Sequence, residues 1–405
     1  MKVEDYREVV GDNTMQQLYE HAEKLKDKHL LCINSTYQGG GVAEMLNSVV
    51  FLFNDLDIQF GWRVLHGSPD FFTVTKKIHN ALQGDIINFS KQKRKVYHET
   101  NARFAKITHI VHDLVLVHDP QPLPMIEFYE KKQPWIWRGH IDLEKPNKRV
   151  WKHMRKYMNK YDEVVVSRKQ YTKKKVKPPQ SIIYPAIDPL SPKNKHINKR
   201  ESRKFLKKHG IKLDKPIISQ VSRFDKWKDP IGVIKVFEKV RKKVDCRLVL
   251  LGSLAADDPE GQEIFQKVDR KVEKSEYKRD IQLVLVENNV LVNCLQRESA
   301  VVIQKSLREG FGLTVSEALY KKTPVVSTKV GGIPLQVIDG VTGFLHKPKS
   351  YKKIAESVVK LLKDEDLRKK MGEAGHEHVK ENFLITRLML DWMKLFEKHL
   401  LEDNR

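Results

Sequence analysis

Short apolar runs alternate with amphipathic segments along the chain. The first run, at 30–33, is followed between residues 42 and 53 by apolar side chains at i, i+3, i+4 and i+7, which is the spacing of one helical face. Similar strand-like runs recur in the first half at 62–65, 114–117, 135–137, 164–166 and 181–184. This alternation of strand and helix patterns predicts βα units and a parallel sheet.

A second alternating series follows the basic stretch at 189–210. Asp229 and Pro230 supply an N-cap and an N1 proline for a helix after the strand-like run at 216–221. Further apolar runs lie at 247–252, 281–285, 300–303 and 324–327, and amphipathic helix patterns lie at 351–363 and around Trp392. We therefore expect two doubly wound α/β domains joined near 185–200, with a final helix that packs on either one.

Length and composition agree with this organisation. A chain of 405 residues exceeds one ordinary core, and a hydrophobic fraction of 40% supports packed cores. No apolar stretch reaches the roughly 18 residues that a membrane span needs, and the charged N-terminus lacks the apolar segment of a secretion signal. The cysteines, Cys32, Cys246 and Cys294, show no metal-ligand spacing and suit buried thiols in a reducing compartment. We expect a cytoplasmic protein.

The formal net charge of +23 concentrates in lysine-rich runs at 91–95, 168–177 and 193–208. Such a charge attracts phosphorylated ligands, nucleic acid or an anionic bilayer. The runs carry little aromatic interleaving and no nucleic-acid-binding signature. Solvated lysine-rich loops are therefore the favoured interpretation, and we expect no specific nucleic acid and no membrane span.

Two glutamates eight residues apart, Glu309 and Glu317, flank a glycine-rich turn. The run at 300–303 predicts a strand before the turn, and the segment from Thr314 predicts a helix start after it. Backbone N–H groups and the positive end of a helix dipole meet there, which suits a phosphate. Glu317 would then accept hydrogen bonds from a polyol such as a ribose, and Glu309 would face the group attached to the phosphate. The alternative is a core strand followed by a capped surface helix.

The loop at 222–229 holds two cations, Arg223 and Lys228, between a strand and a helix. A forked guanidinium and a point-charge ammonium both suit an anion, so the pair is a candidate diphosphate clamp together with the 309–317 turn. The glycine turn at 39–41 lacks the third glycine of a dinucleotide fingerprint and the Gly-Lys-Ser/Thr of a P-loop. It serves either a close approach of the backbone to a phosphate or sugar, or only a tight turn.

Hydrogen-bonding side chains also follow two strands of the first domain, in the segments 118–122 and 138–142. Their histidines lack the i, i+4 pairing of a zinc helix, and no thiol accompanies them. A hydrolytic triad lacks its Gly-x-Ser-x-Gly elbow. Asp55 and Asp57 form an Asp-x-Asp that suits a metal, although an ordinary polar loop is the favoured interpretation there. We expect no metal.

Taken together, these motifs resemble the retaining glycosyltransferases of family 4, which have the GT-B fold: two Rossmann-like α/β domains facing across a cleft. The likeness covers essentially the whole chain and rests on Glu309 with Glu317, Arg223 with Lys228, and the segment 330–334 ahead of 339–344. A narrower likeness to trehalose glycosyl-transferring synthases and trehalose phosphorylases rests on 34–36 with 39–41, 79–84, 118–122, 138–142 and 257–261. The segment 184–188 departs from the pattern, because many relatives carry a glycine before its aspartate.

The resemblance implies different roles for the two domains. Residues 189–384 would bind a nucleoside diphosphate glucose, either UDP- or ADP-glucose. Residues 1–188 would bind the acceptor sugar, and the helix at 385–405 would cross back to them.

The resemblance also implies roles for individual residues. Glu317 would hold the ribose, and Glu309 the donor glucose. Arg223 and Lys228 would hold the diphosphate, and His140 would lie near the donor anomeric centre. The remaining donor-binding residues would be Gly310, Phe311, Gly312, Leu313 and Thr314, with Gly40 and Gly41, and the acceptor-binding residues would be Asp119, Gln121, Arg138 and Asp142.

Motifs and resemblance together predict a retaining glucosyltransferase that makes trehalose reversibly from a nucleoside diphosphate glucose and glucose, without a cofactor. A trehalose phosphorylase, which uses phosphate and glucose 1-phosphate, is the alternative enzyme. A catalytically idle GT-B protein that binds polyanions is the alternative from another class, because of the +23 charge. Nucleotide sugar, glucose and trehalose are the expected partners, and the sequence leaves monomer and homodimer open.

Overall fold

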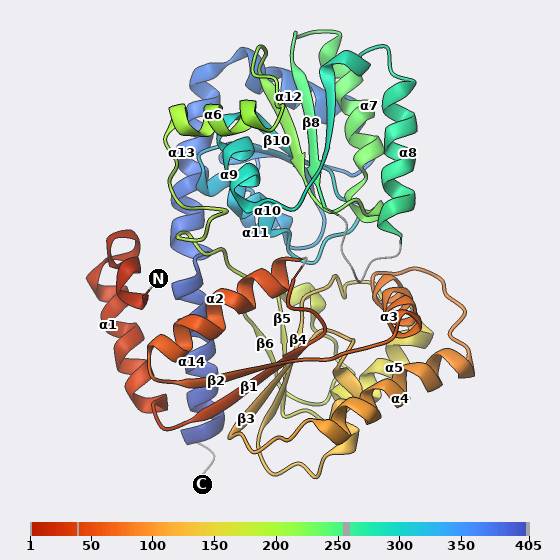
Figure 1. Cartoon of the computed structure of the whole chain (residues 1–405), viewed down its shortest axis with the longest axis vertical. Coiled ribbons are helices and arrows are strands. Elements are labelled where there is room, and N and C mark those ends of the chain that lie inside the picture. The colour runs from red at the N-terminus through yellow and green to blue at the C-terminus, as the bar shows by residue number, and fades with distance from the viewer. Residues whose placement is uncertain (1, 39, 254–259, 402–405) are drawn as a thin grey trace. The chain divides into compact units, whose positions relative to one another are not determined.

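The chain folds into two compact units (Figure 1). The computed structural model describes residues 2–38, 40–253 and 260–401. The N-unit comprises residues 1–186 and 385–405, and the C-unit comprises residues 187–384. The chain therefore passes between the units twice. At the edge of the C-unit the two passages are hydrogen-bonded, because the Ile187 N–H donates to the Phe383 carbonyl at 2.8 Å.

All six strands of the N-unit sheet are parallel, as the alternating pattern predicts. They lie in the order β2-β1-β3-β4-β5-β6. Their bounds are β1 His29–Asn34, β2 Gln59–Val64, β3 Leu114–His118, β4 Trp135–Gly139, β5 Glu163–Val166 and β6 Gln180–Ile182. The strands β3, β4 and β5 are buried along their whole length, which is why they read as uninterrupted apolar runs.

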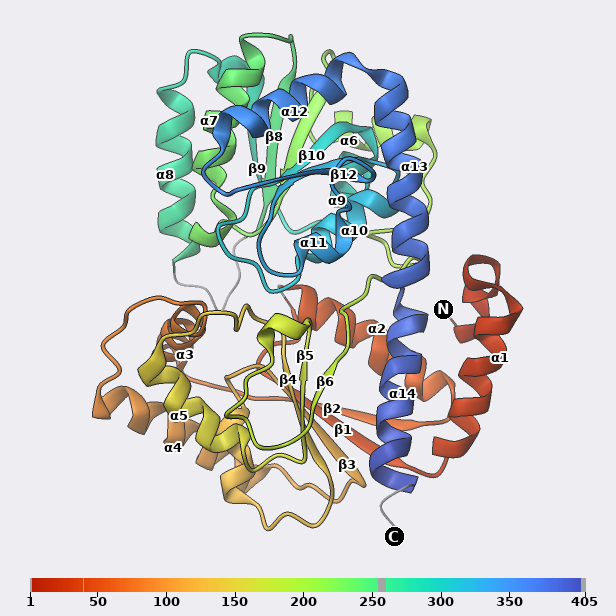
Figure 2. The same ribbon diagram turned by 180° about the vertical axis from the view of Figure 1, so that it is seen from behind.

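Helices cover both faces of this sheet (Figures 1 and 2). They are α1 Arg7–Leu25, α2 Gly41–Asp55, α3 Pro69–Leu82, α4 Lys91–Ile107, α5 Lys148–Met158 and α14 Ile385–Leu401. On one face α3, α4 and α5 share a core with the strands through side chains such as Phe71, Tyr97 and Met154. On the other face α2 and α14 meet through the rings of Phe53 and Phe396, 6.0 Å apart. The return of α14 to the N-unit confirms the crossing helix that the family resemblance implies.

The C-unit repeats this plan with a parallel sheet in the order β12-β11-β10-β7-β8-β9. Its strands are β7 Ile217–Val221, β8 Arg247–Gly252, β9 Ile281–Leu285, β10 Ser299–Gln304, β11 Val325–Thr328 and β12 Gly343–His346. Its helices are α6 Lys199–Lys208, α7 Pro230–Arg241, α8 Gly261–Glu273, α9 Asn289–Glu298, α10 Leu313–Tyr320, α11 Ile333–Gln336, α12 Tyr351–Lys363 and α13 Glu365–Asn382. The predicted N-cap of α7 is confirmed, because the Asp229 carboxylate accepts the Gly232 N–H at 3.0 Å.

Each sheet has a switch point, where the strand order reverses. The switch points lie between β1 and β3 in the N-unit and between β7 and β10 in the C-unit. Open parallel sheets bind ligands beyond the carboxyl ends of the strands at such points. The segments that follow these four strands include the glycine turn at 39–41, the 118–122 segment, the 222–229 loop and the 309–317 turn.

The elements that the sequence analysis did not predict include α1 and β12. The helix α1 contains Gly11, whose φ of +78° breaks the helical geometry and blurs its periodicity. The strand β12 has only four residues and most of them are half-buried. The three cysteines are buried and free, as predicted. Within the described ranges, no helix is both long enough and apolar enough to cross a membrane.

Candidate active site

The loops after β7 and β10 meet in an ion pair. The Lys228 Nζ lies 2.5 Å from Oε2 of Glu309. The same oxygen accepts hydrogen bonds from Gln304 Nε2 at 3.2 Å and from Ser306 Oγ at 3.0 Å. Glu309 is 8% exposed, so three donors hold its carboxylate in a site with little water. Two residues singled out separately in the sequence therefore share one contact.

Main-chain and buried contacts fix the two loops to each other. The Leu307 N–H donates to the Trp227 carbonyl at 2.7 Å. The fully buried Lys305 forms an ion pair with Asp229, the N-cap of α7. Arg223 is half-buried in the same loop as Lys228. The position of this loop is thus set by contacts with β10 and its following residues.

Glycines shape the turn between β10 and α10. Gly312 has a φ of +86° and caps the N-terminus of α10. Gly331 has a φ of +53°, and a Cβ there would lie 1.7 Å from the main-chain oxygen of Glu309. The Gly332 N–H donates to the Gly310 carbonyl at 3.1 Å. The segment 330–334 therefore packs directly against the 309–317 turn.

Glu317 lies about one turn into α10 and is 4% exposed. The Lys193 Nζ is 3.9 Å from its Oε1. Its Oε2 is buried and finds no hydrogen-bond partner among the described residues. A buried carboxylate oxygen without a donor is costly, so this oxygen has the capacity to accept a hydrogen bond from a ligand.

Sequence reasoning missed Lys321, which follows Glu317 by one helical turn. Its Nζ donates to Asn194 Oδ1 at 2.7 Å, to Gln296 Oε1 at 2.9 Å and to the Glu317 carbonyl at 3.0 Å. Three acceptors match the three N–H groups of an ammonium. Burial lowers the pKa of Lys321 to about 7, and the Glu317 carboxylate opposes that shift. The i, i+4 spacing of an acid and a lysine was the available sequence signal.

In the N-unit, the ends of β3 and β4 form a buried cluster. His118 Nδ1 and His140 Nε2 lie 2.9 Å apart, and the Asp119 carboxylate accepts a hydrogen bond from the main-chain N–H of His140 at 2.8 Å. Burial lowers the pKa of His118 to about 3 and the pKa of His140 well below its usual value. Both imidazoles are therefore neutral at neutral pH. Burial raises the pKa of Asp119 to about 7.

Arg138 belongs to the same cluster and is 1% exposed. Its Nη2 donates to Ser167 Oγ at 3.2 Å. Burial lowers the pKa of Arg138 to about 9, against the opposing charge of Asp119. Arg138 Nε and Nη1, His118 Nε2 and Gln121 Oε1 are buried without a hydrogen-bond partner among the described residues. The cluster therefore holds both donors and acceptors that the described protein groups leave unused.

Three further residues predicted from the sequence, Asp142, Gly40 and Gly41, have local structural roles. The Asp142 carboxylate accepts the Glu144 N–H at 2.8 Å in a tight turn. Gly40 caps the N-terminus of α2, and Gly41 is its first residue. Gly39 and residues 257–259, which carried part of the family resemblance, lie outside the described residues.

Asp55, one half of the Asp-x-Asp, has a structural contact. Its carboxylate accepts the Val3 N–H at 2.7 Å. Asp57 follows in a turn with a φ of +59°. In the part of the chain that the structure describes, no group of three histidine, cysteine or acidic side chains is placed to hold a metal ion.

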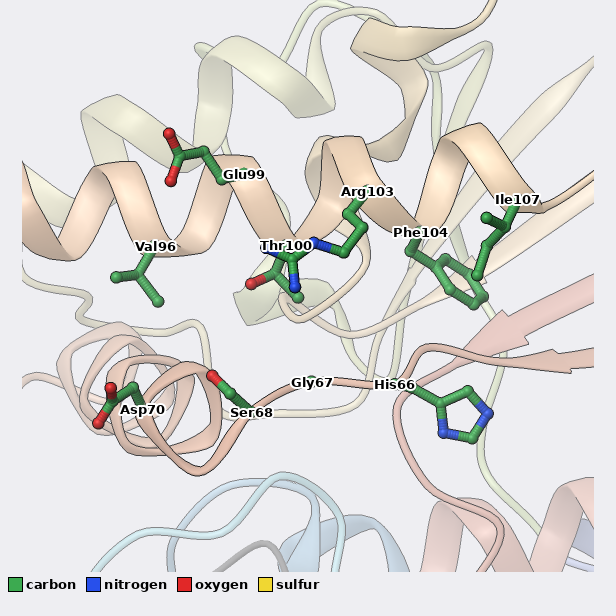
Figure 3. A pocket seen from close by; sticks show the side chains of 10 residues that line it. All are labelled: His66, Gly67, Ser68, Asp70, Val96, Glu99, Thr100, Arg103, Phe104 and Ile107. Atoms are coloured by element: carbon green, nitrogen blue, oxygen red, sulfur yellow. The ribbon is translucent and has the colours of Figure 1, made fainter.

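A cavity of about 410 Å³ lies in the N-unit between α4 and the segment that leads from β2 into α3 (Figure 3). Polar side chains and an apolar floor line it, among them His66, Asp70, Thr100, Arg103 and Phe104. None of the residues predicted from the sequence lines this cavity, so it is a feature separate from the loops after β3 and β4.

Two parallel six-stranded sheets, with charged and glycine-rich loops beyond their switch points, define the GT-B fold. A UDP-forming α,α-trehalose-phosphate synthase from Burkholderia vietnamiensis has the same fold. It superposes with a TM-score of 0.76 over 93% of this chain and 98% of that chain, at 15% sequence identity. This likeness concerns the fold alone.

Sequence comparison gives the family. The model of the trehalose synthase N-terminal domain matches residues 32–173, and the model of group 1 glycosyl transferases matches residues 201–378. A trehalose synthase from Thermococcus litoralis is 44% identical over 401 residues, which are 97% of this chain and 96% of that protein. The chain belongs to the trehalose synthase family of glycosyltransferases. A trehalose phosphorylase from Grifola frondosa is 28% identical, over 97% of this chain and 60% of that protein.

Proposed function

We propose that the protein transfers the glucosyl group of a nucleoside diphosphate glucose to glucose, with retention of configuration, and so makes trehalose reversibly. The observation that carries the proposal is the Lys228–Glu309 contact beyond β7 and β10. A cation and a carboxylate fixed at a switch point suit the diphosphate and the sugar of such a donor. The 44% identity to a protein named trehalose synthase supports the choice of sugars.

The C-unit holds the donor, UDP- or ADP-glucose. Glu317 accepts hydrogen bonds from the ribose, for which its unpartnered Oε2 is available. Arg223 and Lys228 bind the diphosphate, and the N-terminal end of α10 adds its dipole. Glu309 binds the glucose. The rest of the donor site in this unit is formed by Gly310, Phe311, Gly312, Leu313 and Thr314, and the family resemblance assigns Gly40 and Gly41 to the donor as well.

The N-unit holds the acceptor glucose. The unused N–H groups of Arg138 and the unused oxygen of Gln121 offer both kinds of hydrogen-bond partner to sugar hydroxyls. Asp119 and Asp142 complete the acceptor site. The family resemblance assigns His140 to the donor anomeric carbon, a role that suits a neutral imidazole because it adds no charge.

The reaction breaks the bond between the anomeric carbon and the phosphate oxygen. An acceptor hydroxyl oxygen bonds to the same face of that carbon, and its proton passes to the departing diphosphate. Arg223 and Lys228 stabilise the negative charge that develops on the diphosphate. The reaction requires no protein nucleophile, cofactor or metal ion. We place it in the cytoplasm, where buried free thiols persist.

A trehalose phosphorylase is the second candidate, because a protein of that name is 28% identical. The two are separated by incubating trehalose with a nucleoside diphosphate or with inorganic phosphate and identifying the sugar product by chromatography. We expect a nucleoside diphosphate glucose. Cleavage with phosphate, and none with ADP or UDP, would overturn the synthase proposal.

A further inference from the structure

The positive charge that the proposed function does not use gathers in one part of the N-unit. Between residues 145 and 177, thirteen lysines and arginines accompany two acidic residues, which gives +11 of the chain's +23. Both acidic residues are engaged: Asp162 forms an ion pair with Lys131 at 2.6 Å, and Glu163 is fully buried. Lys160 of this segment is also paired, with Glu127 at 2.7 Å, and the remaining basic side chains set the charge of the surface.

The helix α5 carries the centre of this charge on one side. Its cations, spaced i, i+1, i+4, i+7 and i+8, fall within about 120° of the helical circumference. They are Lys148, Arg149, Lys152, Arg155 and Lys156, which we call the α5 stripe. No member of the α5 stripe takes part in an ion pair with another described residue. The opposite side of α5 is buried in the core of the N-unit.

A second basic segment runs beside the α5 stripe. The Lys173 Nζ donates to the Glu144 carbonyl at 2.8 Å, just before α5 begins. The Lys177 N–H donates to Asn159 Oδ1 at 3.0 Å, where α5 ends. The segment between these two anchors therefore follows the helix, and it exposes two further lysines, Lys174 and Lys175.

The start of α4 adds charge on another side of α5, and the two helices lie side by side (Figures 1 and 2). The Arg94 guanidinium lies 5.9 Å from the centre of the Phe89 ring, and that ring lies 5.1 Å from His153 of α5. Burial, together with the charges of Lys156 and Arg94, lowers the pKa of His153 to about 4. The charges of Arg94 in α4 and Lys156 in α5 thus both act on the His153 imidazole.

We propose that this basic face, made of the α5 stripe, the 173–177 segment and the start of α4, binds the phosphate backbone of double-stranded DNA without sequence preference. The cations Lys148, Lys152 and Lys156 recur about every 6 Å along the helix. Duplex DNA is a suitable partner because it carries one negative charge per about 1.7 Å of its axis, which is dense enough to give each of these lysines a phosphate.

The chemistry of the face disfavours other polyanions. Its aromatic rings, Trp151, Tyr157 and Tyr171, pack into the core, so they offer no platform for the stacked bases of a single strand. The apolar side of α5 is also buried, so this helix has no free apolar face to insert into a bilayer. The α5 stripe carries donors only and has no acceptor for a 2′-hydroxyl, the group that marks RNA.

The test measures binding of the full-length protein to a fluorescent DNA duplex of about 24 base pairs by anisotropy, from about 50 to about 200 mM salt. Neutralising about five phosphates gives a log–log salt slope near −4.5 and a loss of roughly 500-fold in affinity over that range. The variant Lys148→Gln/Arg149→Gln/Lys152→Gln/Lys156→Gln removes four charges, and its slope is expected to be shallower by about 3.6.

The helix α6 of the C-unit provides the matched control. It exposes Arg200, Lys204, Lys207 and Lys208, and changing these four to glutamine removes the same charge. This variant is expected to bind DNA as the unchanged protein does. Equal losses in the two variants would overturn the proposal, because net charge alone would then explain binding. Tighter binding to single-stranded DNA or to anionic phospholipid vesicles would overturn it as well.

Unfolding midpoints and trehalose-forming activity of both variants, expected to be unchanged, report on folding. If the α5 variant does not fold, Lys174→Gln/Lys175→Gln tests the same face from outside any helix. Its salt slope is expected to be shallower by about 1.8, and an unchanged slope would contradict the proposal.

Discussion

The Lys228 ammonium and the Glu309 carboxylate lie 2.5 Å apart, although 81 positions separate the two residues in the sequence. Each charge compensates the other in a site that is largely closed to water. Removing one member therefore leaves the other buried without its partner. On the proposed function, the residue that meets the diphosphate and the residue that meets the sugar act as one unit.

The first prediction concerns this unit. Lys228→Ala and Glu309→Gln are each expected to lower kcat/KM for trehalose formation by roughly 2–4 kcal/mol of transition-state stabilisation. The double variant is expected to lose less than the sum of the two, with a coupling of about 1–3 kcal/mol. Initial rates of the unchanged protein, the two single variants and the double variant give this coupling energy. Lys226→Ala in the same turn is the control. Strictly additive losses would show that the two residues act independently.

The second prediction separates the two glutamates. Glu317→Ala is expected to weaken binding of free UDP or ADP about 10- to 150-fold, because a hydrogen bond between a hydroxyl and a charged group contributes roughly 1.5–3 kcal/mol. Glu309→Gln is expected to leave that affinity largely intact and to lower turnover, since its proposed partner is the sugar. Calorimetric titration measures both. Equal changes in nucleotide affinity would contradict the assignment.

The third prediction concerns the source of positive charge at the diphosphate. Transfer is expected to survive exhaustive chelation of divalent ions, whereas Arg223→Ala and Lys228→Ala each lose activity. Lys228→Ala is expected to affect kcat more than KM, because its contact strengthens as the bond breaks. The proposal that Arg223 and Lys228 bind the diphosphate would be refuted if chelation abolished activity, magnesium restored it, and both variants were nearly as active as the unchanged protein.

The fourth prediction compares two glycines with positive φ. Gly331→Ala places a methyl group 1.7 Å from the Glu309 carbonyl, so the turn must move and activity is expected to fall at least tenfold. Gly340 has a φ of +79°, and nothing lies within 4 Å of a Cβ there. Gly340→Ala is expected to cost only about 1 kcal/mol of stability from backbone strain. Transfer rates and urea unfolding distinguish the two variants. Similar transfer rates would mean that the packing of segment 330–334 against the 309–317 turn is unimportant for activity.

The fifth prediction concerns pH and Lys321. Its pKa is about 7 in the folded protein and about 10.4 in an unfolded chain. Between these values the unfolded chain binds more protons, so the free energy of unfolding rises with pH by at most about 1.4 kcal/mol per unit. Below about pH 7 the ammonium is charged in both states, and its contribution is constant. Urea unfolding of the protein and of Lys321→Met should therefore diverge above neutral pH, in favour of the lysine. A constant difference would exclude this burial effect.

Much of the fold follows from the linear pattern. Strands such as β3 and β4 are buried on both faces and appear as uninterrupted apolar runs. The turn between Glu309 and Glu317 could also be predicted from the sequence, because its strand, glycines and helix start are consecutive. Local features of this kind need no knowledge of the rest of the fold.

The contacts within the candidate site could not be predicted from the linear sequence pattern. Lys228 meets Glu309 because β7 lies beside β10, although β8 and β9 come between them in the chain. Lys321 meets Asn194 for a similar reason, across 127 positions. Hydrophobic periodicity reports which face of a strand is buried, but it carries no information on which strands are neighbours.

The helix α14 belongs to the N-unit, yet a ribosome makes it only after the C-unit. Phe396 of α14 contacts Phe53 of α2, and Glu397 lies 2.5 Å from His21 of α1. At the usual rate of synthesis, the intervening 198 residues of the C-unit take about 10–40 s to produce. Throughout that interval the nascent N-unit exposes the apolar surface that α14 later covers. A pause in translating the C-unit therefore prolongs the time during which the N-unit, already almost complete, exposes this surface and is prone to aggregation.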